Sequence, residues 1–164
     1  MSEVSKPSRF LMIGDTIMDF VAKAPESGSA RQYIPFGGGA IANVARHLSK
    51  AQHHVEFITA FAPDPFGAML RRELTGLGVE LRYAQTIAES ESPMCFISNS
   101  EDGERYFLHR GGDPYRELDL TVRDLNLNTY DYFIWGISSV RTAESRFLID
   151  GIMELSTALV VCDP

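Results

Sequence analysis

The chain has 164 residues, of which 45% are hydrophobic and 23% are charged, and its formal net charge is −7. A chain this apolar buries enough surface to offset the conformational entropy lost on folding, so we expect an ordered protein. The acidic balance argues against nucleic acid as a partner, because binding a phosphate backbone needs a basic surface. No apolar run approaches the roughly 20 residues that span a bilayer, so we expect no membrane partner and a cytoplasmic location.

Strand and helix patterns alternate along the chain. In chain order, the patterns predict a strand at 9–13, a helix through 41–48, a strand at 55–58, a helix at 68–77 closed by Gly78, a short strand at 79–83, a strand at 132–136, a helix at 143–155 and a strand at 159–162. Residues 113–129 are polar and read as a short helix or loop. This alternation indicates βαβ units and a largely parallel sheet.

Two further segments, 17–35 and 94–109, read instead as β-hairpins. Their turns are predicted at Pro25–Ser29 and Ser100–Gly103, which carry the residues that tight turns prefer. Hairpins do not fit the βαβ alternation, so we expect them to form a separate small sheet beside the main one.

Side-chain patterns add two expectations. The first helix has an apolar stripe, which places Arg46, His47 and Lys50 on its other side. Cys95 and Cys162 are far apart and match no metal spacing, so two buried thiols are favoured over a disulfide.

Gly37–Gly39 opens the first helix and is the most distinctive motif. Such a run lets a ligand approach the backbone beside the unpaired N–H groups of a helix N-terminus. Asn43, one turn into the helix, can both donate to and accept from a hydroxyl group. A plain tight turn would explain the same glycines. Gly37-x-Gly39-x-x-Ala42 also satisfies a loose dinucleotide-binding pattern, but Pro35–Phe36 precedes it where that pattern needs a strand.

The segment Phe36-Gly-Gly-Gly-Ala-Ile-Ala-Asn-Val-Ala45 resembles the N-terminal signature of the PfkB (ribokinase-like) family of sugar and nucleoside kinases. The Gly-Gly-x-x-x-Asn-x-Ala pattern of that family falls on Gly38, Gly39, Asn43 and Ala45. Four other segments resemble family motifs in the family's order: 12–19, 64–67, 103–111 and 160–164. The sequence departs from the family at Thr59 and Ala62, where glycines are usual, and at Ile41.

The resemblance implies a ribokinase-like α/β fold with a mostly parallel sheet, flanking helices and a small β lid. Residues 1–164 would be the N-terminal part of that domain, with lid segments at about 17–36 and 93–112, and the C-terminal nucleotide-binding half would be absent. The lid would cover the sugar and pair with a second subunit, as in many relatives, to give a homodimer.

The resemblance also implies roles for individual residues. Asp19 would accept hydrogen bonds from sugar hydroxyls, Gly39 would let the sugar ring pack on the backbone, and Asn43 would hold another hydroxyl. Gly38 would also belong to the substrate-binding residues. Arg110 lies where some kinases of acidic sugars place an arginine, although a surface arginine explains it equally. Asp15 is a weaker candidate for lining the site.

The family's catalytic motifs lie outside this sequence. A sugar hydroxyl is a poor nucleophile, so such a kinase needs a base, an anion hole and a metal. In the family a Gly-Ala-Gly-Asp motif supplies the base and an Asn-x-x-Glu motif organises magnesium, and neither occurs here. We therefore expect ATP and Mg²⁺ to serve the intact parent, and no catalytic, cofactor-binding or metal-binding residue in these 164 positions.

Three functions remain open at this point. The first is an ATP-dependent sugar or nucleoside kinase whose acceptor-binding half and lid are supplied by this chain. The second is a truncated, inactive module that binds a sugar, or binds a partner through its lid. The third, which rests on the dinucleotide pattern alone, is a fragment of an oxidoreductase.

Overall fold

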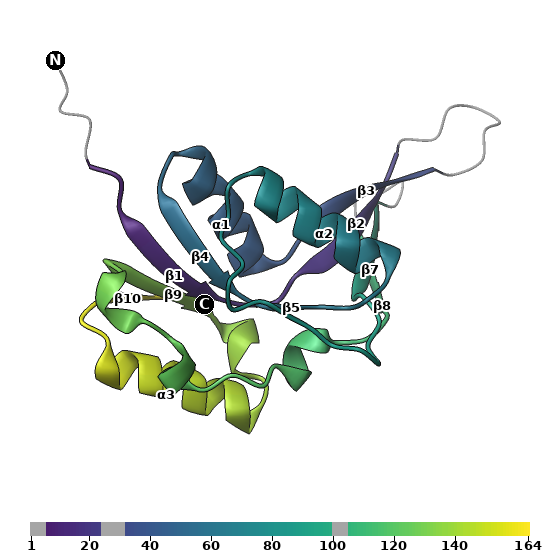
Figure 1. Cartoon of the computed structure of the whole chain (residues 1–164). Helices are drawn as coiled ribbons and strands as arrows, with labels where there is room; N and C mark the ends of the chain where they lie inside the picture. The colour runs from purple at the N-terminus through teal and green to yellow at the C-terminus, as the bar shows by residue number, and fades with distance from the viewer. Residues whose placement is uncertain (1–5, 24–31, 100–104) are drawn as a thin grey trace, which may run out of the picture.

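The computed structural model describes residues 6–23, 32–99 and 105–164. Its main sheet has the strand order β10 (Leu159–Asp163), β9 (Tyr132–Gly136), β1 (Arg9–Ile13) and β4 (His54–Ile58), and all four strands are parallel. Helices α1 (Ala40–Lys50) and α2 (Pro65–Gly76) lie on one side of the sheet, and α3 (Ala143–Leu155) lies on the other (Figure 1). This is the α/β architecture that the alternating patterns predicted.

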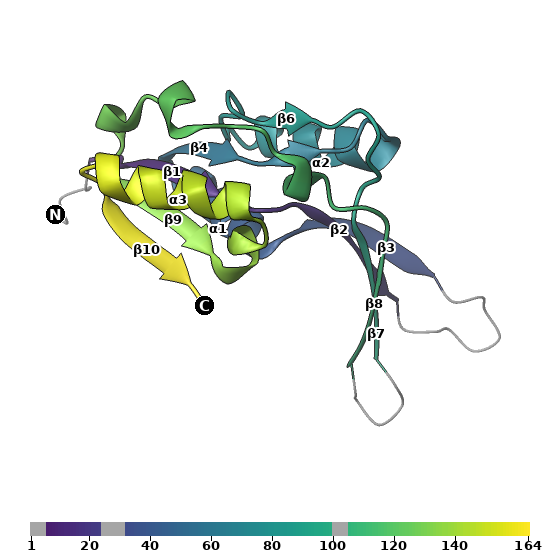
Figure 2. The same ribbon diagram turned by 90° about the horizontal axis from the view of Figure 1, so that it is seen from below.

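The second sheet is also four-stranded, in the order β3 (Tyr33–Gly38), β2 (Ile17–Ala22), β7 (Met94–Asn99) and β8 (Arg105–Arg110). Its two outer pairs are antiparallel and its central pair, β2 with β7, is parallel. These strands project away from the helices of the main layer (Figure 2), so the prediction of a separate small sheet is confirmed. We call it the lid sheet. The predicted turns at Pro25–Ser29 and Ser100–Gly103 lie outside the described residues.

Two hydrophobic clusters hold the main sheet between its helices. Alternate residues of a strand face opposite sides, so Phe10 and Met12 pack toward α1 and α2, whereas Leu11 and Ile13 pack toward α3. All four are buried. The first cluster extends to Met18 of β2, which fixes the base of the lid sheet against α2.

The remaining segments are short. They are β5 (Ala60–Phe61), β6 (Gln85–Thr86) and the 3-10 turns η1 (Pro114–Glu117), η2 (Val122–Asp124), η3 (Leu127–Thr129) and η4 (Ile137–Val140). The strand predicted at 79–83 is wrong, because that segment makes one isolated bridge, Glu80 with Glu56, beside β4. Among the described residues, no helix is long and apolar enough to cross a membrane.

Helix α2 starts three residues earlier than its apolar pattern predicted. Asp64 caps it, because a carboxylate oxygen of Asp64 accepts from the Gly67 N–H at 2.8 Å, and Pro65 occupies the first turn. The other oxygen accepts from the Ser92 N–H at 2.7 Å, which ties the residues before β7 to this helix. The bounds of α3 agree with the prediction.

Three sequence expectations are corrected by the tertiary structure. Arg46 does not face solvent but is buried between α1, α2 and β3, where Glu73 pairs with it. Cys95 is buried, but Cys162 on β10 is exposed, and both are free thiols. A strand, β3, does run into the glycine motif, but it belongs to the lid sheet, where it pairs antiparallel with β2, and not to a βαβ unit.

Candidate acceptor site

The glycine motif joins β3 of the lid sheet to α1, and the Asp19 side chain closely approaches its backbone. The carboxylate of Asp19 lies against Gly38, where an added Cβ would stand 2.2 Å from Asp19 Oδ2. Gly39 has φ of 102°, a conformation that favours glycine, and it ends the strand so that α1 begins at the next residue. Gly38 is buried, and its missing side chain leaves the space that the Asp19 carboxylate fills.

Asn43 stands one turn into α1 and is exposed. Its Oδ1 accepts a hydrogen bond from Arg46 Nη1 at 3.0 Å, and the same nitrogen contacts the Gly38 carbonyl at 3.4 Å. The N-cap residue Gly39 has no side chain, so the first N–H groups of α1 lack a side-chain cap. The structure thus places Asp19 against Gly38 and joins Gly38 to Asn43 through Arg46, with Gly39 between them in the chain.

Asp19 heads a polar row across the lid sheet. Its register partner on β7 is Cys95, whose partner on β8 is His109, so the three residues share one face. Cys95 Sγ lies 3.8 Å from His109 Nε2. Burial raises the pKa of Asp19, while the nearby His109 and Arg46 act to lower it. Burial, with a smaller effect from Asp19, raises the pKa of the Cys95 thiol.

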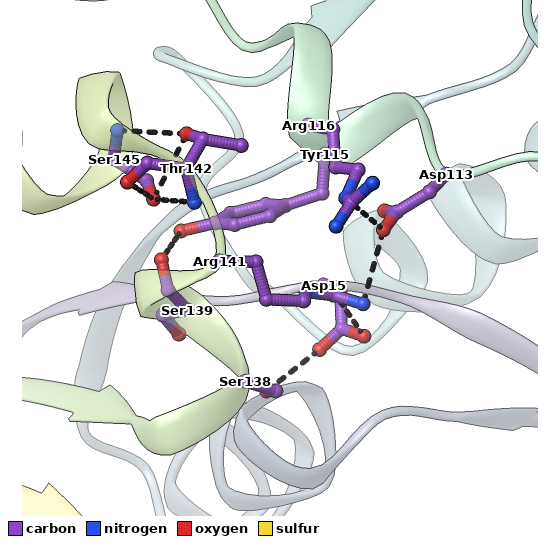
Figure 3. Close-up of polar contacts among 9 residues, drawn as sticks. All are labelled: Asp15, Asp113, Tyr115, Arg116, Ser138, Ser139, Arg141, Thr142 and Ser145. Atoms are coloured by element: carbon purple, nitrogen blue, oxygen red, sulfur yellow. Dashed lines mark hydrogen bonds and ion pairs between the residues drawn. The ribbon is translucent and has the colours of Figure 1, made fainter.

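A second polar group lies at the carboxyl edge of the main sheet (Figure 3). Arg141, which follows η4, bridges Asp15 at 2.9 Å and Asp113 at 3.0 Å. Ser138 donates to Asp15 at 3.2 Å, and Arg116 lies 3.6 Å from Asp113. Burial raises the pKa of Asp113, and Arg141 partly offsets that rise. The network connects the end of β1, the segment after β8 and the segment after β9.

Arg110 lies at the end of β8, is exposed and donates to the His109 carbonyl at 2.8 Å. It lines a pocket of about 300 Å³ together with Asp15, Ile17, His109 and Arg141. Ile17 lies two residues before Asp19 on β2, and His109 belongs to the same polar row as Asp19, so this pocket adjoins the glycine motif. The structure therefore places Arg110 beside the predicted site and Asp15 within the wall of the pocket.

Sequence reasoning missed Arg46, His109, Asp113 and Arg141. Arg46 follows Asn43 by three residues, a spacing that puts both on one helix face, so its contact with Asn43 had a local signal. Asp113 and Arg141 are joined to Asp15 only by the fold, and no sequence spacing connects them. Among the described residues, no group of three His, Cys, Asp or Glu side chains is arranged to hold a metal ion.

Comparison with known proteins settles the family. The sequence profile of the pfkB family carbohydrate kinases matches residues 8–136. The chain belongs to the pfkB family. The fructokinase of Escherichia coli is 31% identical over 114 residues, which are 70% of this chain and 35% of that protein. The aminoimidazole riboside kinase of Salmonella typhimurium is 30% identical over 107 residues, 63% of this chain and 32% of that protein.

Solved structures of similar proteins share the fold. A fructokinase from Xylella fastidiosa, crystallised with bound ATP, superposes with a TM-score of 0.80 at 20% identity, covering 94% of this chain and 51% of that one. A PfkB protein from Polaromonas gives a TM-score of 0.77 at 18% identity, covering 96% of this chain and 55% of that one. The pfkB chain described here thus spans about a third of its curated relatives and about half of these structures.

Proposed function

We propose that this chain is the acceptor-binding half and lid of an ATP-dependent kinase that phosphorylates a hydroxyl of a sugar or nucleoside. The observation that carries the proposal is the Asp19 carboxylate held against Gly38 within the glycine motif, in the space that a side chain would fill. A carboxylate accepts hydrogen bonds strongly, and the neighbouring Gly39, which is only partly buried, has no side chain to hold a sugar ring away from the backbone. Asn43 adds a second polar group beside them. Matches to a fructokinase and to an aminoimidazole riboside kinase support this substrate class.

The lid sheet would cover the bound acceptor. Its β2 and β8 strands carry Asp19 and His109, and the pocket beside them continues to Asp15 and Arg141. Excluding water above the acceptor would strengthen these polar contacts and limit transfer of phosphate to water. Arg110, at the rim of the pocket, would contact the acceptor on the lid side.

The nucleotide, magnesium and catalytic base would come from a C-terminal half. When bound, ATP supplies the transferred phosphoryl group and Mg²⁺ neutralises its charge. The surface of β10 supports this arrangement, since Leu159, Val160 and Val161 are exposed although β10 has the sequence of a buried parallel strand. In the residues described here the acceptor is bound and oriented, and no residue is assigned to proton removal.

The lid sheet is also the proposed surface for a homodimer. Large apolar side chains on β3 and β8 are exposed, at 45% for Ile34, 52% for Phe36, 56% for Phe107 and 48% for Leu108. Ile34, Phe36 and Phe107 share the face that carries Asp19, whereas Leu108 lies on the opposite face. Exposed apolar side chains gathered on one face of a projecting sheet are typical of a protein interface.

An acceptor panel in a longer protein that joins this chain to its C-terminal half tests the proposal. We expect ATP-dependent phosphorylation of one member of a panel of D-fructose, D-ribose and nucleosides. Asp19→Asn should lower kcat/KM for that acceptor by roughly 10- to 100-fold, because a charged hydrogen-bond acceptor is lost. Asp150→Asn, an exposed carboxylate on α3, is the matched control.

Two outcomes would contradict the proposal. Phosphoryl transfer by the 164-residue chain alone would show that the base lies within it. Acceptor binding by the longer protein, with no transfer from ATP to any panel member, would favour the inactive binding module instead.

A further inference from the structure

Arg46 lies against Gly37 at the end of β3, on the opposite face of that strand from Asp19. We call this end of β3, Gly37–Gly38, the glycine strand. Its side chain is only 7% exposed, and a Cβ added to Gly37 would stand 2.3 Å from Arg46 Nη2. A Cβ added to Gly38 would instead meet Asp19. The two glycines therefore make room for two different side chains, one on each face of β3. Burying a guanidinium is costly unless partners satisfy it.

The partners of Arg46 come from three elements. Its Nε pairs with Glu73 Oε1 of α2 at 2.9 Å, and its Nη1 donates to Asn43 Oδ1 at 3.0 Å within α1. The same Nη1 contacts the Gly38 carbonyl of β3 at 3.4 Å. Among the described residues, its buried Nη2 has no hydrogen-bond partner. Arg46 thus fixes the glycine strand and the Asn43 side chain to the same rigid group.

The chemistry of arginine decides how the Asn43 amide is turned. A guanidinium only donates hydrogen bonds, so the Asn43 atom that faces it must be the carbonyl oxygen, and the NH₂ group is left for another partner. We propose that Arg46 is a positioning residue for the acceptor site, which turns the Asn43 amide so that its NH₂ group donates to the bound acceptor. The inference rests on the proposed function, because that function supplies a ligand with hydroxyl groups.

This orientation narrows the class of ligand. Ionised Asp19 can only accept, and Asn43 held by Arg46 can only donate toward the ligand. The pair therefore selects a molecule that offers one hydroxyl hydrogen to Asp19 and one oxygen to Asn43, as a polyol does. A ligand with two donors and no free oxygen would leave the Asn43 NH₂ group unpaired.

Arg46 also acts on Asp19 through its charge. The side chains that share the face of Asp19 are the Cys95 thiol of β7 and His109 of β8, and the charge of Arg46 acts on Asp19 from the other face of β3. Glu73 on α2 partly neutralises Arg46. Burial raises the pKa of Asp19, and the positive charge of Arg46 opposes that rise, which favours the ionised form that accepts hydrogen bonds.

The first test titrates Asp19 in the 164-residue chain by following its side-chain carboxyl ¹³C shift against pH. Arg46→Met should raise the Asp19 pKa, and Arg46→Lys should restore it toward the wild-type value because the charge returns. Glu73→Gln should lower the Asp19 pKa, since Arg46 then loses its counter-charge. The Glu73 side chain is 41% exposed, so this variant keeps the test decisive if Arg46→Met does not fold. An unchanged Asp19 pKa in Glu73→Gln overturns the electrostatic role.

The second test separates the two ends of the Asn43 amide. Asn43→Asp keeps an oxygen for Arg46 but removes the NH₂ donor, whereas Asn43→Ala removes both. We expect Asn43→Asp to unfold at a higher temperature than Asn43→Ala, and both to weaken binding of D-fructose or D-ribose by about tenfold. Wild-type affinity in Asn43→Asp would overturn the assigned orientation. If the wild-type chain responds to neither sugar, binding is measured with the nucleosides of the panel. No response to any panel member means that the proposed function fails in this chain, while the Asp19 titration and the stability comparison still decide the role of Arg46.

Discussion

The two edge strands of the main sheet, β4 and β10, differ in how far they are buried. At β4, Val55 and Phe57 are completely buried, and the chain segment that follows α2 closes the edge. The Phe57 N–H donates to the Glu80 carbonyl at 2.9 Å, and the Glu80 N–H donates to the Val55 carbonyl at 2.8 Å. At β10, by contrast, Leu159 is 65% exposed and Val161 is 44% exposed.

This difference teaches that an apolar strand is buried only where the fold supplies a neighbour. Both strands have the apolar sequence expected at the centre of a parallel sheet. Beyond β4 the chain returns through Glu80 to cover the edge, whereas among the described residues β10 pairs only with β9. The β10 edge is therefore the surface on which the proposed C-terminal half would be added.

The largest expected effect contrasts the loss of an apolar side chain at each of the two edges. Phe57→Ala should lower the free energy of unfolding by about 3–5 kcal/mol, because a large side chain leaves the core. Val161→Ala should change it by less than about 0.5 kcal/mol, since the side chain is already partly hydrated. Urea unfolding of the 164-residue chain measures both values. A large loss in Val161→Ala would show that the β10 edge is covered in solution, and the contrast between the edges would fail.

A smaller effect is expected at Glu56, which holds the closed edge. Glu56 is 2% exposed and one of its oxygens accepts from the Arg82 N–H at 2.8 Å. Glu56→Ala should lower the free energy of unfolding by about 1–3 kcal/mol, because a buried contact is lost. Glu56→Gln retains an oxygen for Arg82 and is the matched control. Equal stability of the Ala and Gln variants would show that this contact does not hold the edge.

The contribution of Glu56, which contacts Arg82, to the free energy of unfolding should change with pH in one direction. Burial raises the pKa of Glu56 above its ordinary value of 4.5, and Arg82 opposes this rise. The folded state therefore binds the proton more readily than the unfolded state. Relative to Glu56→Gln, the wild type should gain stability as the pH falls from the raised folded pKa to 4.5, and lose that gain as the pH rises again. Unfolding curves at several pH values measure the difference.

The smallest expected effect is a difference in the labelling rates of the two thiols, which leaves the stability of the chain unchanged. Cys162 on the open edge is exposed, whereas Cys95 in the lid sheet is 3% exposed and has a raised pKa. Iodoacetamide should label Cys162 roughly 100-fold faster than Cys95, because only accessible thiolate reacts. Cys162→Ser should remove the fast phase alone. Equal rates, seen by mass spectrometry, would mean that β10 is covered or that the lid sheet opens readily.

Much of the fold could be predicted because local patterns and their tertiary outcome agree. Alternation of apolar strands and amphipathic helices gave the parallel sheet, and the turn residues gave the separate lid sheet. The start of α2 was misplaced because Asp64, a cap, lies outside the apolar pattern. The segment 79–83 was misread as a strand because its apolar residues suggest one, whereas the structure has a single bridge at Glu80 followed by a turn.

The residues of the candidate acceptor site also fall into those that a local motif could identify and those that only the fold brings together. Gly38, Gly39 and Asn43 lie close together in the sequence, so a motif could identify them, and Asp19 reaches them through the hairpin register. Arg46 was assigned to solvent because a charged residue on a helix is usually exposed, and only the glycine strand above it shows why it is buried. Asp113 and Arg141 meet Asp15 from distant parts of the chain, which no local pattern records.

The sequence by itself determined the family, the alternation of elements and the residues of the glycine motif, because these depend on spacing within short segments. Only the tertiary structure decided which charges pair, which thiol is exposed and which sheet edge is closed. Pairing and burial depend on segments that meet in space after folding, and the free energy of a charge or an apolar side chain follows from those neighbours.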